Sequence, residues 1–338
     1  MLVEDLNLIT IQNNLLSVPS PEINMWFPIP REGEVNYESR IDISNIQITE
    51  KYVETLDEYL LKALTDFTGY SKLRPDGFLV ALSGGIDSSV VARLLQLFAQ
   101  KNATEFKAII IGQGSPDTEV KQYLGTPAEW LDIQFARQLC HDLQIPYDYI
   151  DVSEEVGAAR SHYKTSWAVS SQLPRIRANH LYSNAEEFDL IPVGSINGSE
   201  YILAAFSTGG PAGNIAPLAD LYKSEVYALA RDIGVPDYIQ KRKPLISELN
   251  IADCELYGGE RIDSTIIDPI IRRLWYQKQN PQEVSDNLCH SVRWINEIFQ
   301  KRIKGEEARR GYSPFVINRP LKAKTYKPNL VIDRSYFP

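Results

Sequence analysis

Residues 78–89 of the sequence read Phe78-Leu79-Val80-Ala81-Leu82-Ser83-Gly84-Gly85-Ile86-Asp87-Ser88-Ser89, and an apolar helical stretch follows from Val90. This order predicts a buried strand, a glycine-rich turn and a helix that begins in the turn. Glycines let the backbone approach an anion closely, and the first amides of a helix have no intrahelical partner. Because these amides lie at the positive end of the helix dipole, the segment predicts a phosphate-binding loop.

The polar side chains of this loop refine the prediction. Ser83, Ser88 and Ser89 add hydroxyl donors. Asp87 would repel a polyphosphate unless a cation lay between them, which makes its carboxylate a candidate Mg²⁺ ligand. The alternative is a tight strand-to-helix turn that binds nothing and has Asp87 as its N-terminal cap. The segment lacks the Gly-Lys-Ser/Thr ending of the common P-loop, which disfavours kinases and GTPases.

Composition limits the possible class and location of the protein. The chain has 338 residues, of which 43% are hydrophobic and 23% charged, as is typical of a soluble globular protein. A net charge of −9 argues against general nucleic-acid binding, and no apolar run approaches membrane-spanning length. The N-terminus lacks the pattern of a secretion signal. Cys140, Cys254 and Cys289 form no CxxC pair, so we expect a cytoplasmic protein without disulfides.

The hydrophobic pattern divides the chain into three parts. Residues 1–45 predict an irregular, proline-containing N-terminal arm, residues 46–304 a domain of alternating helices and strands, and residues 305–338 a C-terminal arm. The predicted strands lie at residues 78–82, 106–111, 147–152 and 190–193. Their near-continuous apolar character indicates an α/β fold, a Rossmann-like doubly wound parallel sheet flanked by helices. Ligands of such sheets bind beyond the carboxyl ends of the strands.

Two later segments deliver polar groups to the same edge of the sheet. Val193-Gly194-Ser195-Ile196-Asn197-Gly198-Ser199-Glu200 follows the last predicted strand, and Glu200 is a candidate second Mg²⁺ ligand. The alternative for Glu200 is a solvent-facing glutamate that favours the dipole of a helix N-terminus. Lys223 lies near the start of another predicted helix, which begins at Val226, and there the dipole slightly disfavours a cation. A phosphate partner would explain Lys223, and a solvated lysine is the alternative.

These motifs resemble a known family. The loop is similar to the pyrophosphate loop of N-type ATP pyrophosphatases, and residues 46–301 resemble NAD synthetases in the order and spacing of their motifs. The resemblance implies that the loop at Ser83–Ser89 binds ATP and that Glu200 binds Mg²⁺, which would complete the shell that Asp87 begins. It also implies that Ser195 and Lys223 contact ATP. Arg175 matches an arginine that contacts deamido-NAD, although Arg175 and Arg177 could instead pair with acids such as Glu186.

The same resemblance implies a reaction. A carboxylate attacks the α-phosphorus of ATP, pyrophosphate leaves, and ammonia displaces AMP to form an amide. Asp87, Glu200 and Lys223 would then carry the catalysis. The family further implies a homodimer. Cys140 and Cys289 are expected in the cores of amphipathic helices, so the nitrogen should come from free ammonia, another amine or a separate amidotransferase.

The departures from the family pattern concentrate on recognition of the acid. Thr208 stands where the family has a lysine and Asn214 where it has an aspartate, and both are candidate acid-substrate contacts. Ser171 replaces an asparagine, and Ile246 replaces a hydroxyl residue on the ATP side. Three hypotheses follow: an ammonia-dependent NAD synthetase, a related ligase for a different carboxylic acid, and a non-catalytic nucleotide-binding subunit. The intact Asp87, Glu200 and Lys223 argue against the third.

Overall fold

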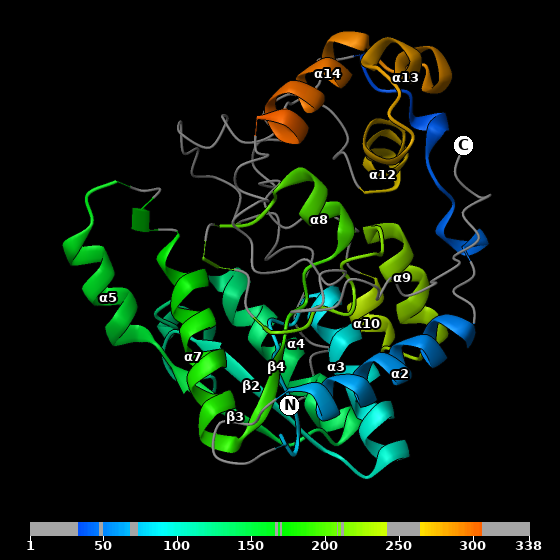
Figure 1. Cartoon of the computed structure of the whole chain (residues 1–338). Coiled ribbons are helices and arrows are strands. Elements are labelled where there is room, and N and C mark those ends of the chain that lie inside the picture. The colour runs from blue at the N-terminus through cyan, green and yellow to red at the C-terminus, as the bar shows by residue number, and fades with distance from the viewer. Residues whose placement is uncertain are drawn as a thin grey trace.

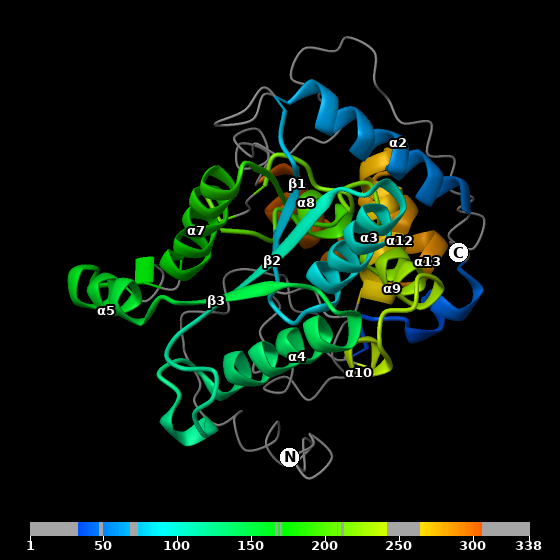
Figure 2. The same ribbon diagram turned by 90° about the horizontal axis from the view of Figure 1, so that it is seen from below.

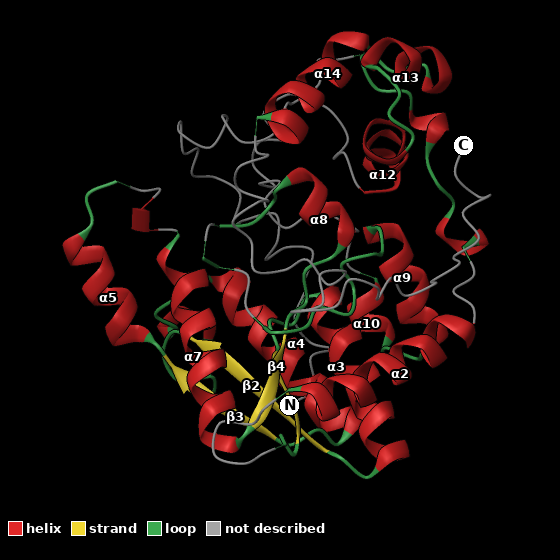
Figure 3. Ribbon diagram, viewed as in Figure 1, coloured by secondary structure: helices red, strands yellow, loops and turns green. Residues whose placement is uncertain are grey.

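A parallel sheet forms the centre of the molecule (Figure 1 and Figure 3). The computed structural model describes residues 33–46, 50–67, 74–165, 168–169, 171–207, 209–210, 213–241 and 264–305. Its strands lie in the spatial order β3-β2-β1-β4. Their bounds are Gly77–Ala81 for β1, Glu105–Gly112 for β2, Tyr147–Asp151 for β3 and Leu190–Val193 for β4. The strand order reverses between β1 and β4, so their carboxyl ends form the switch point where such sheets bind ligands.

Helices cover both faces of the sheet. Successive side chains of β1 point to opposite faces and so enter two different cores. Phe78 and Val80 belong to the core shared with α3 (Ile86–Asn102) and α4 (Pro127–Leu143). Leu79 belongs to a second core shared with α5 (Ser153–His162) and α7 (Gln172–Phe188). Figure 2 shows these two pairs of helices on opposite sides of the strands. β1 is therefore buried on both faces, as its unbroken apolar sequence predicts.

Of the remaining helices, α8, α9, α12, α13 and α14 lie at or beyond the carboxyl edge of the sheet (Figure 1). α9 packs against α3, and α12 packs against both α8 and α9. α12, α13 and α14 gather beyond α8, away from the strands (Figure 1). Their bounds are Glu50–Asp66 for α2, Gly198–Leu203 for α8, Lys223–Asp232 for α9, Asp237–Gln240 for α10, Ser264–Ile271 for α12, Pro281–Leu288 for α13 and Val292–Glu297 for α14. Short 3₁₀ turns lie at Tyr37–Ser39, Ile43–Asn45 and Val120–Gln122, and π-helical turns at Arg272–Tyr276 and Ile298–Lys304.

The described part of the N-terminal arm packs on the C-terminal helices. The Asn36 backbone N–H donates to His290 Nδ1 at 2.9 Å, and Ser39 Oγ lies 2.9 Å from His290 Nε2. Arg293 Nε donates to Glu34 Oε1 at 2.6 Å. Residues 34–39 are thus held by contacts with residues some 250 positions away in the sequence.

The predicted fold class is confirmed, and the four strands lie within a residue or two of their predicted positions. The boundaries of the two arms stay a prediction. One detail was wrong: Cys289 is exposed, because it follows the last residue of α13 in a left-handed conformation instead of lying in the helix core. Cys140 is buried in α4, as expected. Within the described ranges, every helix is too short or too polar to cross a membrane.

The buried His290 makes the stability of the fold pH-dependent. Burial lowers the pKa of His290 to about 4, and its neutral ring accepts the hydrogen bond from Asn36. The usual histidine pKa is about 6.5, so between these values the unfolded chain binds more protons and stability falls as the pH falls. We expect the free energy of unfolding to be about 1 kcal/mol lower at pH 5.5 than at pH 7.5 through this group.

Urea denaturation at the two pH values measures the difference, with His290→Gln as the control that removes the titrating group. A pH dependence of equal size in the wild type and in His290→Gln would show that another group is responsible.

Candidate active site

The loop after β1 adopts a backbone shape that requires glycine. Gly84 has φ of +77°, and a Cβ at this position would lie 1.9 Å from the carbonyl oxygen of Asp132 in α4. Any larger residue would therefore both strain the backbone and push α4 away. Gly85 is the N-cap of α3, so the first amides of this helix open toward the loop. The loop has the form expected of a phosphate cradle, and ATP as its ligand stays a prediction.

The three serines of the loop differ in what their hydroxyls contact. Ser88 and Ser89 are buried, and both hydroxyls donate to the carbonyl oxygen of Gly85, at 3.2 and 2.8 Å. Ser88 Oγ also accepts the backbone N–H of Ser83 at 3.1 Å. Ser83 itself is exposed. Its hydroxyl lies 3.0 Å from Ser88 Oγ and accepts the Gly85 N–H at 3.3 Å, so all three serines help to fix the shape of the loop, and a contact of Ser83 with ATP stays a prediction.

Three charged side chains meet at the carboxyl edge of β1 and β4. Asp87 lies in the first turn of α3, Glu200 in the first turn of α8, and Lys223 is the first residue of α9. The Lys223 ammonium donates to Asp87 Oδ2 and lies 3.9 Å from Glu200 Oε1. The side chains of Asp87, Glu200 and Lys223 are 16, 10 and 4% exposed. Asp87 is not the helix cap, because Gly85 is the N-cap of α3. Glu200 is not solvent-facing and Lys223 is not solvated, because both side chains are largely buried.

The electrostatics of this trio follow from burial and charge. Burial by itself lowers the pKa of Lys223, but the carboxylates of Asp87 and Glu200 outweigh it and raise the pKa above its usual value. Lys223 therefore remains protonated at neutral pH. Two carboxyl groups thus face one ammonium, a donor set that a further cation could join when a polyphosphate binds.

Asn197 connects two members of the trio, and the sequence analysis did not assign it a role. Asn197 is fully buried, and its Nδ2 donates to Asp87 Oδ1 at 3.0 Å. Its Oδ1 accepts the backbone N–H of Glu200 at 3.0 Å, while Glu200 Oε2 accepts the Asn197 N–H at 3.4 Å. This is a capping box, and its signal in the sequence was an Asn followed three residues later by Glu. The box fixes the helix start that carries Glu200.

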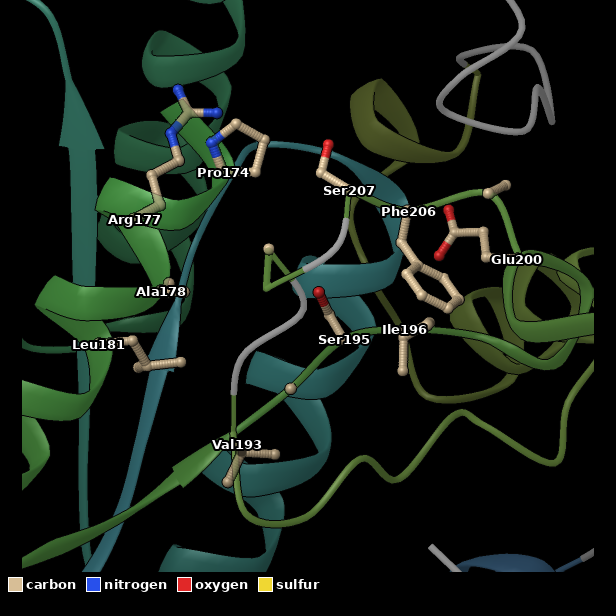
Figure 4. A pocket seen from close by; sticks show the side chains of 14 residues that line it. Pro174, Arg177, Ala178, Leu181, Val193, Ser195, Ile196, Glu200, Phe206 and Ser207 are labelled. Atoms are coloured by element: carbon tan, nitrogen blue, oxygen red, sulfur yellow. The ribbon is translucent and has the colours of Figure 1, made fainter. Parts of the chain in front are cut away.

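A cavity of about 280 Å³ opens beside the trio (Figure 4). Arg177 on α7 and Glu200 on α8 lie on opposite sides of it, and Ser195 lies between them. Among the described residues that line the cavity, Arg177 is the only basic one. The lining consists of Ala81, Pro174, Arg177, Ala178, Leu181, Val193, Gly194, Ser195, Ile196, Glu200, Ala205, Phe206, Ser207 and Gly210. The predicted ATP contact Ser195 therefore shares a cavity with the predicted metal ligand Glu200.

Of the two arginines singled out in the sequence, Arg175 and Arg177, only Arg177 lines the cavity. Arg177 Nη2 donates to Glu129 Oε1 at 2.6 Å, and Glu129 Oε2 accepts Gln113 Nε2 at 2.7 Å. The alternative, that Arg177 pairs with an acid of its own helix such as Glu186, does not describe the structure, because its carboxylate partner is Glu129 of α4. Arg175, the predicted acid contact, does not line the cavity, and its role stays a prediction.

The other candidate acid contacts lie in the segment between α8 and α9. Asn214 is exposed, and its backbone N–H donates to the carbonyl oxygen of Pro192 at 2.7 Å. Tyr182 Oη accepts the backbone N–H of Gly213 at 3.1 Å, which ties this segment to α7. Thr208 and Ile246 lie outside the described residues.

The site offers a small oxygen donor set for a cation. Within the described ranges, no three His, Cys, Asp or Glu side chains gather as a complete metal site. Asp87 and Glu200 instead supply two carboxylates that already converge on one positive charge, the Lys223 ammonium. Mg²⁺ commonly takes one or two protein carboxylates and completes its shell with phosphate oxygens and water, so these residues fit the ion.

Comparison with known proteins identifies the family of the chain. The family model described as NAD synthase matches residues 58–311. The chain belongs to the NAD synthase family. An NH₃-dependent NAD⁺ synthetase of Sulfolobus acidocaldarius is 31% identical to this family member over 262 residues, which are 74% of this chain and 87% of the relative. One from Methanosarcina acetivorans is 31% identical over 252 residues, 71% and 89% of the two chains.

Solved structures share the fold of this NAD synthase family member. The NH₃-dependent NAD synthetase of Campylobacter jejuni matches with a TM-score of 0.57 at 21% identity, covering 79% of this chain and 98% of that one. The NMN synthetase of Francisella tularensis matches with a TM-score of 0.55 at 22% identity, covering 77% and 95%. Both likenesses agree with the sheet and flanking helices described above.

The contact between Asn197 and Asp87 can be tested without breaking the helix cap. Asn197→Asp keeps the oxygen that caps α8 but replaces the donor to Asp87 with a negative charge. We expect the rate of pyrophosphate release from Mg·ATP to fall at least about tenfold, since losing a supporting contact of a metal ligand typically costs 10–100-fold.

Asn280→Asp is the matched control, because Asn280 forms the same capping box with Glu283 at the start of α13. It should leave the rate unchanged. Equal rates for Asn197→Asp and Asn280→Asp would remove Asn197 from the account of the site.

Proposed function

We propose that this chain is an ATP-dependent amide ligase that adenylates the carboxylate of deamido-NAD and transfers ammonia to it. The convergence of Asp87, Glu200 and Lys223 beside a phosphate-type loop carries the proposal. Membership of the NAD synthase family and the relatives named NH₃-dependent NAD⁺ synthetases support the same reaction. A carbon–nitrogen ligase that uses ATP as co-substrate is the activity expected of this family.

The chemistry explains why ATP is needed. A carboxylate resists ammonia because its negative charge repels the nucleophile and an oxide ion is a very poor leaving group. Attack of one carboxylate oxygen on the α-phosphorus of ATP forms an acyl adenylate and releases pyrophosphate. Ammonia then attacks the acyl carbon, and AMP leaves with that carboxylate oxygen. The amide nitrogen loses a proton in the same step, so atoms and charge balance.

The residues of the site suit the first step. Negative charge grows on the departing pyrophosphate, and fixed donors aimed at it lower the barrier without reorganising. The first amides of α3 and the ammonium of Lys223 are such donors, and both lie at the carboxyl edge of β1 and β4. Mg²⁺, held by Asp87 and Glu200, would neutralise charge on the phosphates when bound.

The described cysteines do not suit glutamine hydrolysis. Burial raises the pKa of the Cys140 thiol to about 12, so it does not form a thiolate at neutral pH. Cys289 is exposed and adjacent to His290, but the two ring nitrogens of His290 are occupied by Asn36 and Ser39. Free ammonia, or ammonia from a separate amidotransferase, is therefore the proposed nitrogen source. A homodimer is proposed from the family resemblance alone.

A different carboxylic acid is the second candidate. Thr208 and Asn214 replace a lysine and an aspartate of the family pattern, and Asn214 is exposed in this structure. Arg177, held by Glu129, gives the cavity a cation for an anionic group of the substrate. The fold is shared with an NMN synthetase, so the fold alone does not choose the acid.

Incubating the purified chain with ATP, Mg²⁺, ammonium and deamido-NAD decides between the two acids. We expect NAD and AMP in equal amounts by chromatography, because one AMP leaves for each amide formed. Glutamine in place of ammonium should give none. Bound Mg·ATP without any NAD would contradict deamido-NAD as the acid and favour the second candidate.

The same assay tests the metal ligands. Chelation with EDTA should stop pyrophosphate release and added Mg²⁺ should restore it, since the phosphates need charge neutralisation. Asp87→Ala and Glu200→Ala should each lower the rate at least about 100-fold, while Asp286→Ala on the exposed side of α13 should not. Retained activity in both site variants would refute the assignment.

A further inference from the structure

A buried carboxylate that no part of the proposed reaction uses lies behind the trio. Asp268 sits on α12 and is 0% exposed. α12 packs against both α8 and α9, the helices that carry Glu200 and Lys223. The hydroxyl of Ser199 links the Asp268 carboxylate to the backbone N–H of Lys223.

The hydrogen bonds of Asp268 run to the neighbours of both charged residues. Its Oδ1 accepts the hydroxyl of Ser199 at 2.6 Å, and Ser199 directly precedes Glu200. Its Oδ2 accepts the backbone N–H of Ser224 at 2.9 Å, and Ser224 directly follows Lys223. Ser199 Oγ in turn accepts the backbone N–H of Lys223 at 2.9 Å. One carboxylate therefore fixes two helix starts relative to each other.

These bonds also provide acceptors for the first backbone N–H groups of α9. The first amides of a helix have no intrahelical acceptor, and those of Lys223 and Ser224 are buried. Ser199 and Asp268 supply the two acceptors from other helices. Asp268 of α12 therefore supports the start of α9, directly at Ser224 and through Ser199 at Lys223, beside the capping box that Glu225 forms with Tyr222.

Packing alone would not favour a carboxylate at this position. Burial raises the pKa of Asp268 to about 7, although the hydrogen bonds from Ser199 and Ser224 oppose the rise. Asparagine has nearly the same shape and no charge to desolvate. An amide, however, offers one acceptor oxygen, and the contacts to Ser199 and Ser224 need two.

We propose that Asp268 is the positioning residue of the site: through Ser199 and Ser224 it holds the start of α9 so that the Lys223 ammonium meets the phosphates of ATP between Asp87 and Glu200. The proposal rests on the proposed function only in taking ATP as the ligand of Lys223. It predicts that substitutions of Asp268 act on nucleotide binding and do so through Lys223.

Calorimetric titration with Mg·ATP tests this coupling in the full chain. We expect Asp268→Asn to weaken binding about tenfold, within the range found when a supporting contact is lost. Lys223→Ala should weaken it at least as much. The double variant should bind like Lys223→Ala alone, within twofold, because Asp268 then has no lysine left to position.

Two further variants keep the test decisive. Ile267→Ala removes a fully buried side chain from the same helix and leaves the bonds of Asp268 in place, so it should bind Mg·ATP like the wild type. If Asp268→Asn does not fold, Ser199→Ala replaces it in the same cycle, because it breaks the link from Asp268 to the Lys223 amide.

Wild-type affinity for Mg·ATP in Asp268→Asn would overturn the proposal. It would also be overturned if the losses of affinity of the two single variants multiplied in the double variant, or if Ile267→Ala lost as much affinity as Asp268→Asn. The same pattern of affinities in a protein that does not turn over deamido-NAD would contradict only the proposed acid.

Discussion

The pairing of the buried Lys223 ammonium with two carboxylates is the interaction on which this structure depends. An ammonium with a 4% exposed side chain must be paired, and Asp87 and Glu200 supply the charge. Removing one partner of a buried ion pair typically costs about 3–5 kcal/mol, because the other charge is left uncompensated. Three helix starts must therefore meet at one point, and the sheet provides that point where its strand order reverses between β1 and β4.

A second set of contacts holds these three helix starts in position relative to one another. Asn197 ties Glu200 to Asp87, and Asp268 ties the start of α8 to the start of α9. These supporting residues are fully buried. Glu200 can thus line the cavity while the geometry of the trio is set by groups that water does not reach. This division suits a reaction in which charge develops on a departing pyrophosphate, since preorganised donors stabilise it best.

The sequence predicted what is local and missed what depends on long-range packing. The strand, glycine turn and helix at residues 78–102 could be read directly, because Gly84 and the apolar run leave the backbone few alternatives. The contact of Asn197 with Asp87 spans 110 residues, and that of Ser199 with Asp268 spans 69. No periodicity reports such contacts. The same limit applies to Arg177: the alternative that the sequence offered was an acid such as Glu186 of the same helix, whereas the partner Glu129 is 48 residues away.

The exposure of Cys289 has a different cause. The apolar spacing around it is that of a helix, but the chain leaves α13 one residue earlier, in a left-handed conformation that turns the side chain outward. Helix ends are set by capping and by tertiary contacts more than by periodicity.

The central claim is that the carboxylate oxygen of the acid becomes part of AMP at this site. Deamido-NAD with ¹⁸O at both oxygens of its nicotinate carboxylate, turned over with Mg·ATP and ammonium, tests it directly by mass spectrometry of the products. The account predicts one ¹⁸O in each AMP and none in pyrophosphate. Unlabelled AMP, or label appearing in pyrophosphate or inorganic phosphate, would contradict adenylation and with it the role assigned to Asp87, Glu200 and Lys223.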